Sequence, residues 1–337
     1  MEDKCFENKD VLLENYNYVI APELIAQKPV EKRDDCRLFV IDRLSGNFYH
    51  KKFSDICDYF SQGDCIIINN TKVVASRLFG KKISGAKVEL LFLDPFENGG
   101  QYTVLMKPFM QAGKKAYFED GYECEIKSKT SRGETIVVFN KPGIMQLLEK
   151  RGVMPLPPYI NRKNGLALEL SDFDRQRYQT VYAKNPGAIA APTAGLHFMP
   201  ETFEALKNKG VNIAKLTLHV GWGTFKPIVN EHLAQHQMMS EKFSIDSQNA
   251  EIINKALLSG KKVAAVGTTS SRALESLSSA AGFEREGKRQ IKEYSGETSI
   301  FIYPGYKFKI INTLITNLHL PKSTPIMMAS AFAGREL

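Results

Sequence analysis

Between about Arg77 and Asn140 the chain alternates short apolar runs with turn-forming residues. Gly113-Lys114 and Asp120-Gly121 are examples of the turns. The runs, each of β type, are Val88–Leu93, Tyr102–Met106, Glu123–Ile126 and Ile136–Phe139. Short strands at regular spacing predict a small antiparallel barrel or sandwich.

The segments that flank this region have a different pattern of apolar and polar residues. Upstream, Cys65–Ile68 is a short apolar strand, and the polar turn Asn69-Asn70-Thr71 follows it. Downstream, Lys141 to Arg151 has the pattern of one amphipathic helix. Three prolines within residues 155–158 then exclude a helix or a central strand, so this stretch is expected to be a stiff linker.

After the prolines, apolar strands alternate with helices. The expected strands are Ala188–Ala191, Ile213–Val220, Lys262–Val266 and Thr313–Thr316, and the expected helices include Thr202–Lys209 and Ser247–Ser259. Each of these helices stops at a glycine. Alternation of this kind predicts a largely parallel sheet. We therefore expect an α/β fold in which residues 1–76 and 151–337 form one domain and residues 77–150 form an inserted β-barrel domain.

Composition changes this picture little. The length of 337 residues suggests roughly two domains. The basic excess, 45 − 37 = +8, permits a polyanionic partner without requiring one. No apolar run approaches the roughly 18 residues that cross a bilayer, and the polar start at Met1–Asp10 is unlike a secretory signal. The five cysteines are odd in number and show no C-x-x-C spacing, so we expect a reduced cytoplasmic protein.

Polar residues cluster directly after each of the four C-terminal strands. In α/β sheets, ligands bind beyond the carboxyl ends of the strands. If these strands are parallel, three histidines converge there with several hydroxyls and an arginine. In chain order the residues are Thr193, Gly195, His197, His219, Gly221, Gly223, Thr224, Thr268, Thr269, Ser270, Arg272, Asn317 and His319.

The loop Gly267–Arg272 joins a strand to a helix, so free N–H groups and the positive end of the helix dipole point to its mouth. Four hydroxyls and a guanidinium add donors, which suits a carboxylate or a phosphate. An ordinary helix cap is the alternative interpretation. Gly221 and Gly223 allow a ligand to approach the backbone closely, but no third glycine completes a dinucleotide fingerprint, and no P-loop motif occurs.

Each histidine also has a purely structural interpretation as a core or loop-bracing residue. The case for His197, His219 and His319 rests on their shared position after strands. His232 and His236 are four residues apart, but no third ligand lies nearby, so no metal site is expected.

The stretch Arg177-Tyr178-Gln179 combines a cation, an aromatic ring and an amide, a combination that stacks on and hydrogen-bonds unpaired bases. A half-buried strand edge is the alternative. Lys72 and Arg77 form one of several basic clusters. Each cluster is an ordinary solvent-exposed surface unless the fold brings the clusters together into one basic patch.

Taken together, the stretches resemble the S-adenosylmethionine:tRNA ribosyltransferase-isomerase (QueA) family. The resemblance covers nearly the whole chain in the family's order. The strings that carry it span residues 22–27, 69–73, 155–160, 178–183, 191–198, 218–225, 266–272, 304–306 and 316–324.

This resemblance implies a barrel-like α/β catalytic domain with an inserted small antiparallel β-barrel. It also implies the reaction, in which the ribosyl part of S-adenosylmethionine moves onto preQ1 at the wobble position of tRNA and rearranges to give epoxyqueuosine, while adenine and methionine leave. S-adenosylmethionine is then the co-substrate, preQ1-containing tRNA is the partner, and a monomer without a metal is expected.

On this hypothesis a histidine removes a proton beside the sulfonium, and His197, His219 and His319 are unranked candidates. The Gly267–Arg272 loop holds the methionine carboxylate, and Arg177, Tyr178 and Gln179 contact a base. The other residues named after the strands are expected to bind substrate, and Lys72 and Arg77 to bind tRNA.

The match has departures. Family members usually continue past the equivalent of residues 330–334 with an aromatic segment, whereas this chain ends at Leu337. Trp222 and Ser271 stand where a smaller residue and a valine are common. A catalytically impaired tRNA-binding relative is therefore the alternative, and a methyltransferase that uses the same co-substrate ranks last, since it would need a glycine-rich nucleotide loop.

Overall fold

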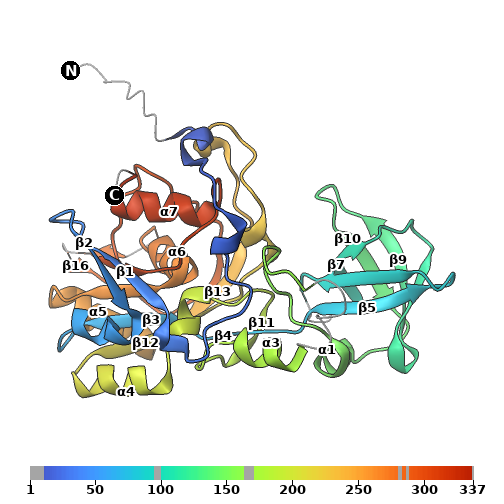
Figure 1. Cartoon of the computed structure of the whole chain (residues 1–337), viewed down its shortest axis with the longest axis horizontal. Coiled ribbons are helices and arrows are strands. Elements are labelled where there is room, and N and C mark those ends of the chain that lie inside the picture. The colour runs from blue at the N-terminus through green and yellow to red at the C-terminus, as the bar shows by residue number, and fades with distance from the viewer. Residues whose placement is uncertain (1–10, 95–99, 163–170, 280–282, 286–287, 336–337) are drawn as a thin grey trace.

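The computed structural model describes residues 11–94, 100–162, 171–279, 283–285 and 288–335. The polar start at Met1–Asp10, with Cys5, lies outside these residues. Figure 1 shows a larger α/β body joined to a smaller β-barrel at one end.

The α/β body is built on a six-stranded sheet with the order β17-β13-β12-β3-β14-β18. Strands β3 (Cys65–Asn69), β12 (Asn212–Leu218), β14 (Val263–Val266) and β18 (Thr313–Ile315) are parallel. Strand β13 (Glu241–Ile245) runs antiparallel to β12, and β17 (Tyr294–Thr298) runs antiparallel to β13. Every residue of β3 is buried, as expected for a central parallel strand covered on both faces.

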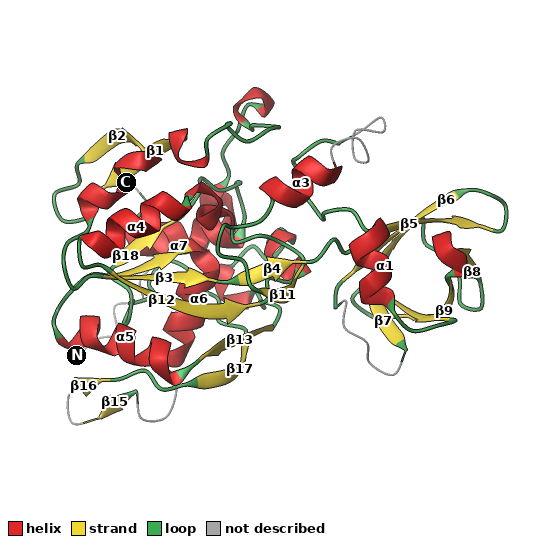
Figure 2. Cartoon of the chain, turned by 90° about the horizontal axis from the view of Figure 1, so that it is seen from below, coloured by secondary structure: helices red, strands yellow, loops and turns green. Residues whose placement is uncertain are grey.

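Helices cover both faces of this sheet, because alternate residues of β3 point to opposite sides. Cys65 and Ile67 pack with α5 (Ser247–Leu258) and α6 (Gly267–Leu277). Ile66 and Ile68 pack with α4 (Pro200–Asn208) and with the 3₁₀ helix Phe53–Tyr59. Figure 2 shows α4 and α5 on opposite sides of the strands.

The barrel is closed in the order β10-β7-β6-β5-β8-β9, and all of its pairs are antiparallel. Its strands are β5 (Arg77–Lys82), β6 (Lys87–Phe92), β7 (Gln101–Lys107), β8 (Lys115–Tyr117), β9 (Glu123–Lys129) and β10 (Thr135–Phe139). Helix α1 (Ile144–Arg151) packs its apolar face into the barrel core. Gly152 follows the helix, and a Cβ there would lie 2.0 Å from the Ala75 carbonyl oxygen. The segment that enters the barrel region and the segment that leaves it are therefore in close backbone contact at this point.

Smaller elements complete the fold. They are the hairpin β1 (Arg37–Ile41) and β2 (Phe48–Lys52), the parallel pair β4 (Thr71–Val73) and β11 (Asn185–Ala188), the pair β15 (Glu284–Arg285) and β16 (Lys288–Arg289), and helices α3 (Ser171–Arg177) and α7 (Thr324–Ala333). Short 3₁₀ helices cover Leu13–Tyr16, Pro22–Leu24, Arg33–Asp35, Glu119–Gly121, Thr193–His197, Trp222–Phe225 and Leu233–Gln235. None of the helices in the described ranges is long and apolar enough to cross a membrane.

The α/β class and the inserted antiparallel barrel are confirmed. One strand prediction was wrong. The strand expected at Ala188–Ala191 lies earlier, as β11, and pairs with β4 outside the six-stranded sheet. Strands β13 and β17 were missed, because buried and more exposed residues alternate along them and neither has a continuous apolar run. The domain boundaries at residues 76 and 151 stay a prediction.

Candidate active site

The parallel strands bring three of the four polar loops to one edge of the sheet. Asn69 ends β3 and is fully buried at this edge. Its side chain donates to the Leu218 carbonyl (2.9 Å) and accepts from the Leu218 N–H (3.0 Å), at the end of β12. It also reaches the Thr269 hydroxyl on α6 (3.5 Å). The side-chain amide of Asn69 thus links the end of β3 to the end of β12 and to the start of α6.

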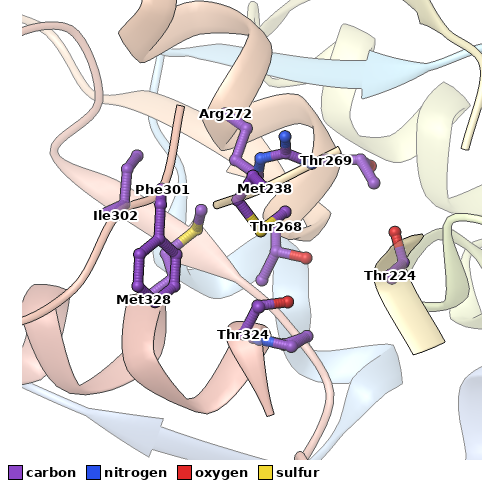
Figure 3. A pocket seen from close by; sticks show the side chains of 10 residues that line it. Thr224, Met238, Thr268, Thr269, Arg272, Phe301, Ile302, Thr324 and Met328 are labelled. Atoms are coloured by element: carbon purple, nitrogen blue, oxygen red, sulfur yellow. The ribbon is translucent and has the colours of Figure 1, made fainter. Parts of the chain in front are cut away.

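A narrow cleft opens beside this edge, and the space between its walls together with the solvent at its mouth is about 320 Å³. Its walls combine hydroxyls, thioethers, an aromatic ring and one guanidinium (Figure 3). The lining residues are Thr224, Met238, Thr268, Thr269, Arg272, Phe301, Ile302, Thr324, Pro325 and Met328. The predicted residues Thr224, Thr268, Thr269 and Arg272 therefore share one cavity.

The guanidinium in this cleft belongs to a buried ion pair. Arg272 and Glu241 have side chains that are 7% and 3% exposed, and Arg272 Nη1 donates to Glu241 Oε2. The other carboxylate oxygen, Oε1, accepts the Gly221 N–H (2.8 Å) and the Thr224 hydroxyl (3.3 Å). Arg272 Nε donates to the Ile300 carbonyl (3.0 Å). Glu241 therefore holds both the guanidinium and the loop after β12.

One nitrogen of Arg272 remains without a partner. Nη2 is buried and makes no hydrogen bond to the described part of the chain. A buried charged donor without a partner is costly, so its presence at a cavity wall points to an anionic or carbonyl ligand. A bound carboxylate would satisfy it with a charge-assisted hydrogen bond.

The serines of the same loop are not available to a ligand. The Ser270 hydroxyl donates to the Val266 carbonyl (2.7 Å), and the Ser271 hydroxyl donates to the Gly267 carbonyl (3.2 Å). Both residues are fully buried. The expectation that Ser270 binds substrate is therefore not supported by its geometry, because the first turn of α6 uses the hydroxyl.

His219 follows β12 and is held by a hydroxyl. Its Nδ1 lies 2.9 Å from Thr71 Oγ1, which also lies 3.4 Å from the Asn185 carbonyl oxygen. A carbonyl can only accept, so the Thr71 hydroxyl donates there and accepts from His219 Nδ1–H. The basic lone pair is then on Nε2, which has no hydrogen-bond partner within the described ranges. Burial lowers the pKa of His219, and Asp94, in the loop after barrel strand β6, opposes that shift.

His197 has both ring nitrogens engaged. Nδ1 lies 3.1 Å from Cys36 Sγ, and Nε2 lies 3.1 Å from Asn317 Oδ1. Burial raises the pKa of the Cys36 thiol to about 11, so the thiol donates to Nδ1 and Nε2–H donates to Asn317. Burial also lowers the pKa of His197. This histidine is therefore a neutral link that orients Asn317.

His319 lies after β18, and its Nε2 is 2.9 Å from the Thr316 hydroxyl. Burial lowers its pKa to about 4, so the ring is neutral near pH 7. The Tyr18 hydroxyl donates to the carbonyl of the same residue, which ties the N-terminal segment to this loop. The three predicted histidines thus have three separate sets of partners.

The glycines differ in how much room they leave. A Cβ at Gly195 would lie 2.0 Å from the Tyr182 hydroxyl, and one at Gly223 would lie 2.9 Å from Met239 Cβ. At these two positions the chain itself occupies the space that was assigned to a ligand. At Gly221 the nearest atom is 3.8 Å away, so close approach remains possible only there. Thr193 begins the 3₁₀ helix that carries His197 and is partly exposed.

Of the residues expected to contact tRNA, three have side chains that are already used in contacts within the protein. Arg177 donates to the carbonyls of Glu31 and Val30, and Gln179 bonds both backbone groups of Val73 (3.0 and 2.7 Å). Tyr178 is 7% exposed, which leaves no ring face for stacking on a base. The contacts of these three residues are therefore structural, but the stretch is not the strand edge given as the alternative, because Arg177 ends α3 and residues 178–179 form the turn after it.

Lys72 and Arg77 remain at the surface near the junction with the barrel. Lys72 is exposed on β4, directly after Thr71. Arg77 begins β5 and pairs with Glu89 at 3.2 Å.

Several residues of the site were missed in the sequence. Glu241 lies on an antiparallel strand with no motif around it. Thr71 and Asn69 were seen only as a turn, although two polar residues directly after a buried strand were a usable signal. Thr324 lay in one of the strings that carry the family resemblance but had no assigned role, and Met238 gave no signal. Among the described residues no group of three potential ligands is arranged to hold a metal ion.

The cleft lies at the carboxyl edge of a mixed α/β sheet that is joined to a closed antiparallel barrel, and this edge is where α/β enzymes commonly bind their ligands. A family model described as "Queuosine biosynthesis protein" matches residues 13–337. The S-adenosylmethionine:tRNA ribosyltransferase-isomerase of Acetivibrio thermocellus is 44% identical over 327 residues, which are 96% of this chain and 91% of that protein. The chain belongs to this family of ribosyltransferase-isomerases.

A solved structure agrees with this assignment. The crystal structure of S-adenosylmethionine tRNA ribosyltransferase from Thermotoga maritima matches with a TM-score of 0.51 and 28% sequence identity. The match covers 96% of this chain and 90% of that one.

Proposed function

We propose that this protein transfers the ribosyl part of S-adenosylmethionine to preQ1 at the wobble position of tRNA and isomerises it, giving epoxyqueuosine with release of adenine and methionine. The observation that carries the proposal is the unpartnered Nη2 of Arg272 in a hydroxyl-lined cleft, in a chain of this family. S-adenosylmethionine combines the groups that such a cleft accepts: a carboxylate, a sulfonium and a polar sugar.

The methionine end of the co-substrate fits the cleft around Arg272. Its carboxylate would accept from Nη2, with the Thr268 and Thr324 hydroxyls as further donors. Phe301 lines the same cleft, and an aromatic face attracts a sulfonium as it attracts other cations. Because Glu241 neutralises the guanidinium charge, the site holds a carboxylate without a large excess of positive charge.

His219 is the histidine best placed to act as the base. The carbon acid beside the sulfonium loses its proton to an unprotonated ring nitrogen, and Thr71 directs that lone pair to Nε2. The lowered pKa of His219 keeps the ring unprotonated near pH 7. The proton therefore moves from the methylene to Nε2, and the Thr71 hydroxyl stabilises the imidazolium at Nδ1–H.

Adenine must leave with a proton or a hydrogen bond. Asn317 receives His197 Nε2–H on Oδ1, which leaves the amide N–H₂ group as the available donor. We assign that donor to the departing adenine. In this scheme His197 is a positioning residue and His319 is a neutral structural residue.

For tRNA we assign Lys72 and Arg77 to phosphate contacts, because they lie at the junction between the barrel and the sheet, and Lys72 directly follows Thr71, which contacts His219. We also propose that the enzyme acts as a monomer without a metal, in the cytoplasm where tRNA is modified. The alternative of a relative that binds tRNA without catalysis is kept as an outcome of the experiment.

The test incubates the protein with S-adenosylmethionine and preQ1-containing tRNA, followed by mass spectrometry of the RNA and chromatography of free adenine. Ribosyl addition with an equal amount of adenine supports the proposal. Binding without product identifies a catalytically impaired relative, and a methyl gain with S-adenosylhomocysteine identifies a methyltransferase. Either of the last two results refutes it.

A further inference from the structure

The hairpin of β1 and β2 presents an aromatic face to solvent. Phe39 is 43% exposed and Phe48 is 62% exposed, although large apolar side chains of this kind are usually buried. The Phe39 ring lies 5.5 Å from the Phe48 ring and 5.3 Å from the His50 ring, measured between centroids. The three rings form one continuous surface, which we call the aromatic face.

The pairing register explains why these rings share one side. Arg37 pairs with Lys52, Phe39 pairs with His50 and Ile41 pairs with Phe48, so these side chains alternate onto the same face. The intervening pairs carry Leu38, which packs against the core, and Tyr49, which is exposed on the opposite face. The aromatic face therefore points away from the body of the protein.

Cations flank the rings at one end. Arg37 and Lys52 are both exposed and form the pair next to Phe39 and His50. Lys52 lies 3.4 Å from Asp35. Exposed ion pairs of this kind contribute little to stability, so Lys52 can leave Asp35 for another anion at little cost. At the far end, the Asp42 carboxylate accepts the Leu44 N–H and stabilises the turn. The aromatic face thus combines π surfaces with two neighbouring cations, of which Lys52 is paired with Asp35.

The hairpin is fixed at both ends. Arg43, in the turn, lies 3.9 Å from the centre of the Phe332 ring and donates to the Phe332 carbonyl (2.9 Å) on α7. At the root, Cys36 bonds His197, and the Phe53 ring lies 5.5 Å from the His197 ring. The root of the hairpin therefore contacts His197, and the rings begin at Phe39, about 10 Å along the strand from Cys36 at about 3.4 Å per residue. Figure 1 shows the hairpin on the side of the sheet opposite the barrel.

We infer that the aromatic face binds unpaired bases of the tRNA substrate by stacking, with Arg37 and Lys52 contacting the adjoining phosphates. The inference rests on the proposed function, since it places the RNA of that reaction on a second surface beside the active site. Rigid, exposed rings flanked by cations are the combination that binds single-stranded RNA without reading its sequence. The continuity with His197 favours a nucleic acid over an unrelated protein, and the flanking cations oppose the pairing of two copies of this chain.

The experiment compares three proteins: the wild type, F39L/F48L and the control Y49L. Leucine keeps an apolar side chain but removes the π surface, and Tyr49 is 46% exposed on the other face of the same hairpin. Affinity for a labelled preQ1-containing anticodon stem-loop is measured by fluorescence anisotropy at fixed salt. We expect F39L/F48L to bind about tenfold more weakly, within the range found when base–aromatic stacks are removed, and Y49L to bind like the wild type.

A second measurement tests the cations. The double variant R37Q/K52Q should reduce the slope of log affinity against log salt by about 0.7–0.9 for each phosphate that is no longer neutralised. KM for S-adenosylmethionine should not change in any of these variants, because none of the residues lines the cleft. Circular dichroism melting checks that each variant is folded.

Equal stem-loop affinity of F39L/F48L and wild type overturns the inference. So does a change in sedimentation of the free protein with unchanged RNA affinity, which would make the face an interface between copies. The proposed function fails separately, if the wild type forms no product. The comparison of affinities is independent of turnover, so the two failures are distinguishable.

Discussion

The ion pair between Arg272 and Glu241 permits the sharpest test of the site, because one pair serves both stability and binding. In Glu241→Gln the side chain still accepts the Gly221 N–H, but the guanidinium loses its counter-charge while 7% exposed. An uncompensated buried charge costs about 3–5 kcal/mol, against a total stability of about 5–15 kcal/mol. We therefore expect a large loss of stability from a change of one atom type.

Adding Arg272→Met removes the stranded cation. The double variant E241Q/R272M keeps the Gly221 hydrogen bond. The main group that it leaves without a hydrogen-bond partner is the Ile300 carbonyl, which lowers stability by about 1–3 kcal/mol. It should therefore be more stable than E241Q alone by about 2 kcal/mol. Urea unfolding followed by circular dichroism measures all three proteins.

Binding should not recover with stability. A hydrogen bond to a charged group contributes about 1.5–3 kcal/mol, so removal of the Arg272 guanidinium should raise KM for S-adenosylmethionine by about 10- to 150-fold. KM for tRNA should stay the same and serves as the control. A double variant that regains stability and also keeps the wild-type KM for S-adenosylmethionine would refute the carboxylate assignment.

Three other predictions concern the histidines. Thr71→Val should lower kcat about fivefold, as loss of a hydrogen bond of about 1 kcal/mol implies, with both KM values unchanged in an adenine-release assay. Gly187→Ala should lower kcat and cost about 1–3 kcal/mol of stability, because φ is +147° and the new Cβ would lie 2.7 Å from His219 Nδ1. His319 has a pKa lowered from 6.5 to about 4, so the unfolded state binds its proton first, and stability should fall by up to about 3 kcal/mol as pH drops from 6.5 to 4.

Two of these predictions have a control variant, and the first has a result that would contradict it. Gly305→Ala introduces a side chain at φ +100° with no atom within 4 Å, so it measures backbone strain without a histidine contact. Unchanged kcat in Thr71→Val would remove His219 from the role of base. For the third prediction, His319→Gln should flatten the dependence of unfolding free energy on pH in urea titrations, and an unchanged slope would contradict it.

The sequence determined much of the fold, because its signals are local. The continuous apolar run of β3 predicts a strand buried on both faces, and it is one. Helices α4 and α5 end just before Gly210 and Gly260, which were the predicted stops. Alternation with turn residues predicted the all-β insertion, although β5 and β8 were not named, since one carries charges and the other has three residues.

The tertiary structure decided the chemistry of the site. The sequence pattern placed Arg272, Thr268 and Thr269 after a strand, and they line the cleft. It did not reveal Glu241, 31 residues away on an antiparallel strand, or the burial of Tyr178. Periodicity reports which residues face inward, but the partner that each one meets depends on strand order and register, which arise only when distant segments pair. For that reason the sequence indicated the family and its candidate loops. Only the fold determined that Arg272 Nη2 is the donor without a partner and that the basic lone pair of His219 is on Nε2.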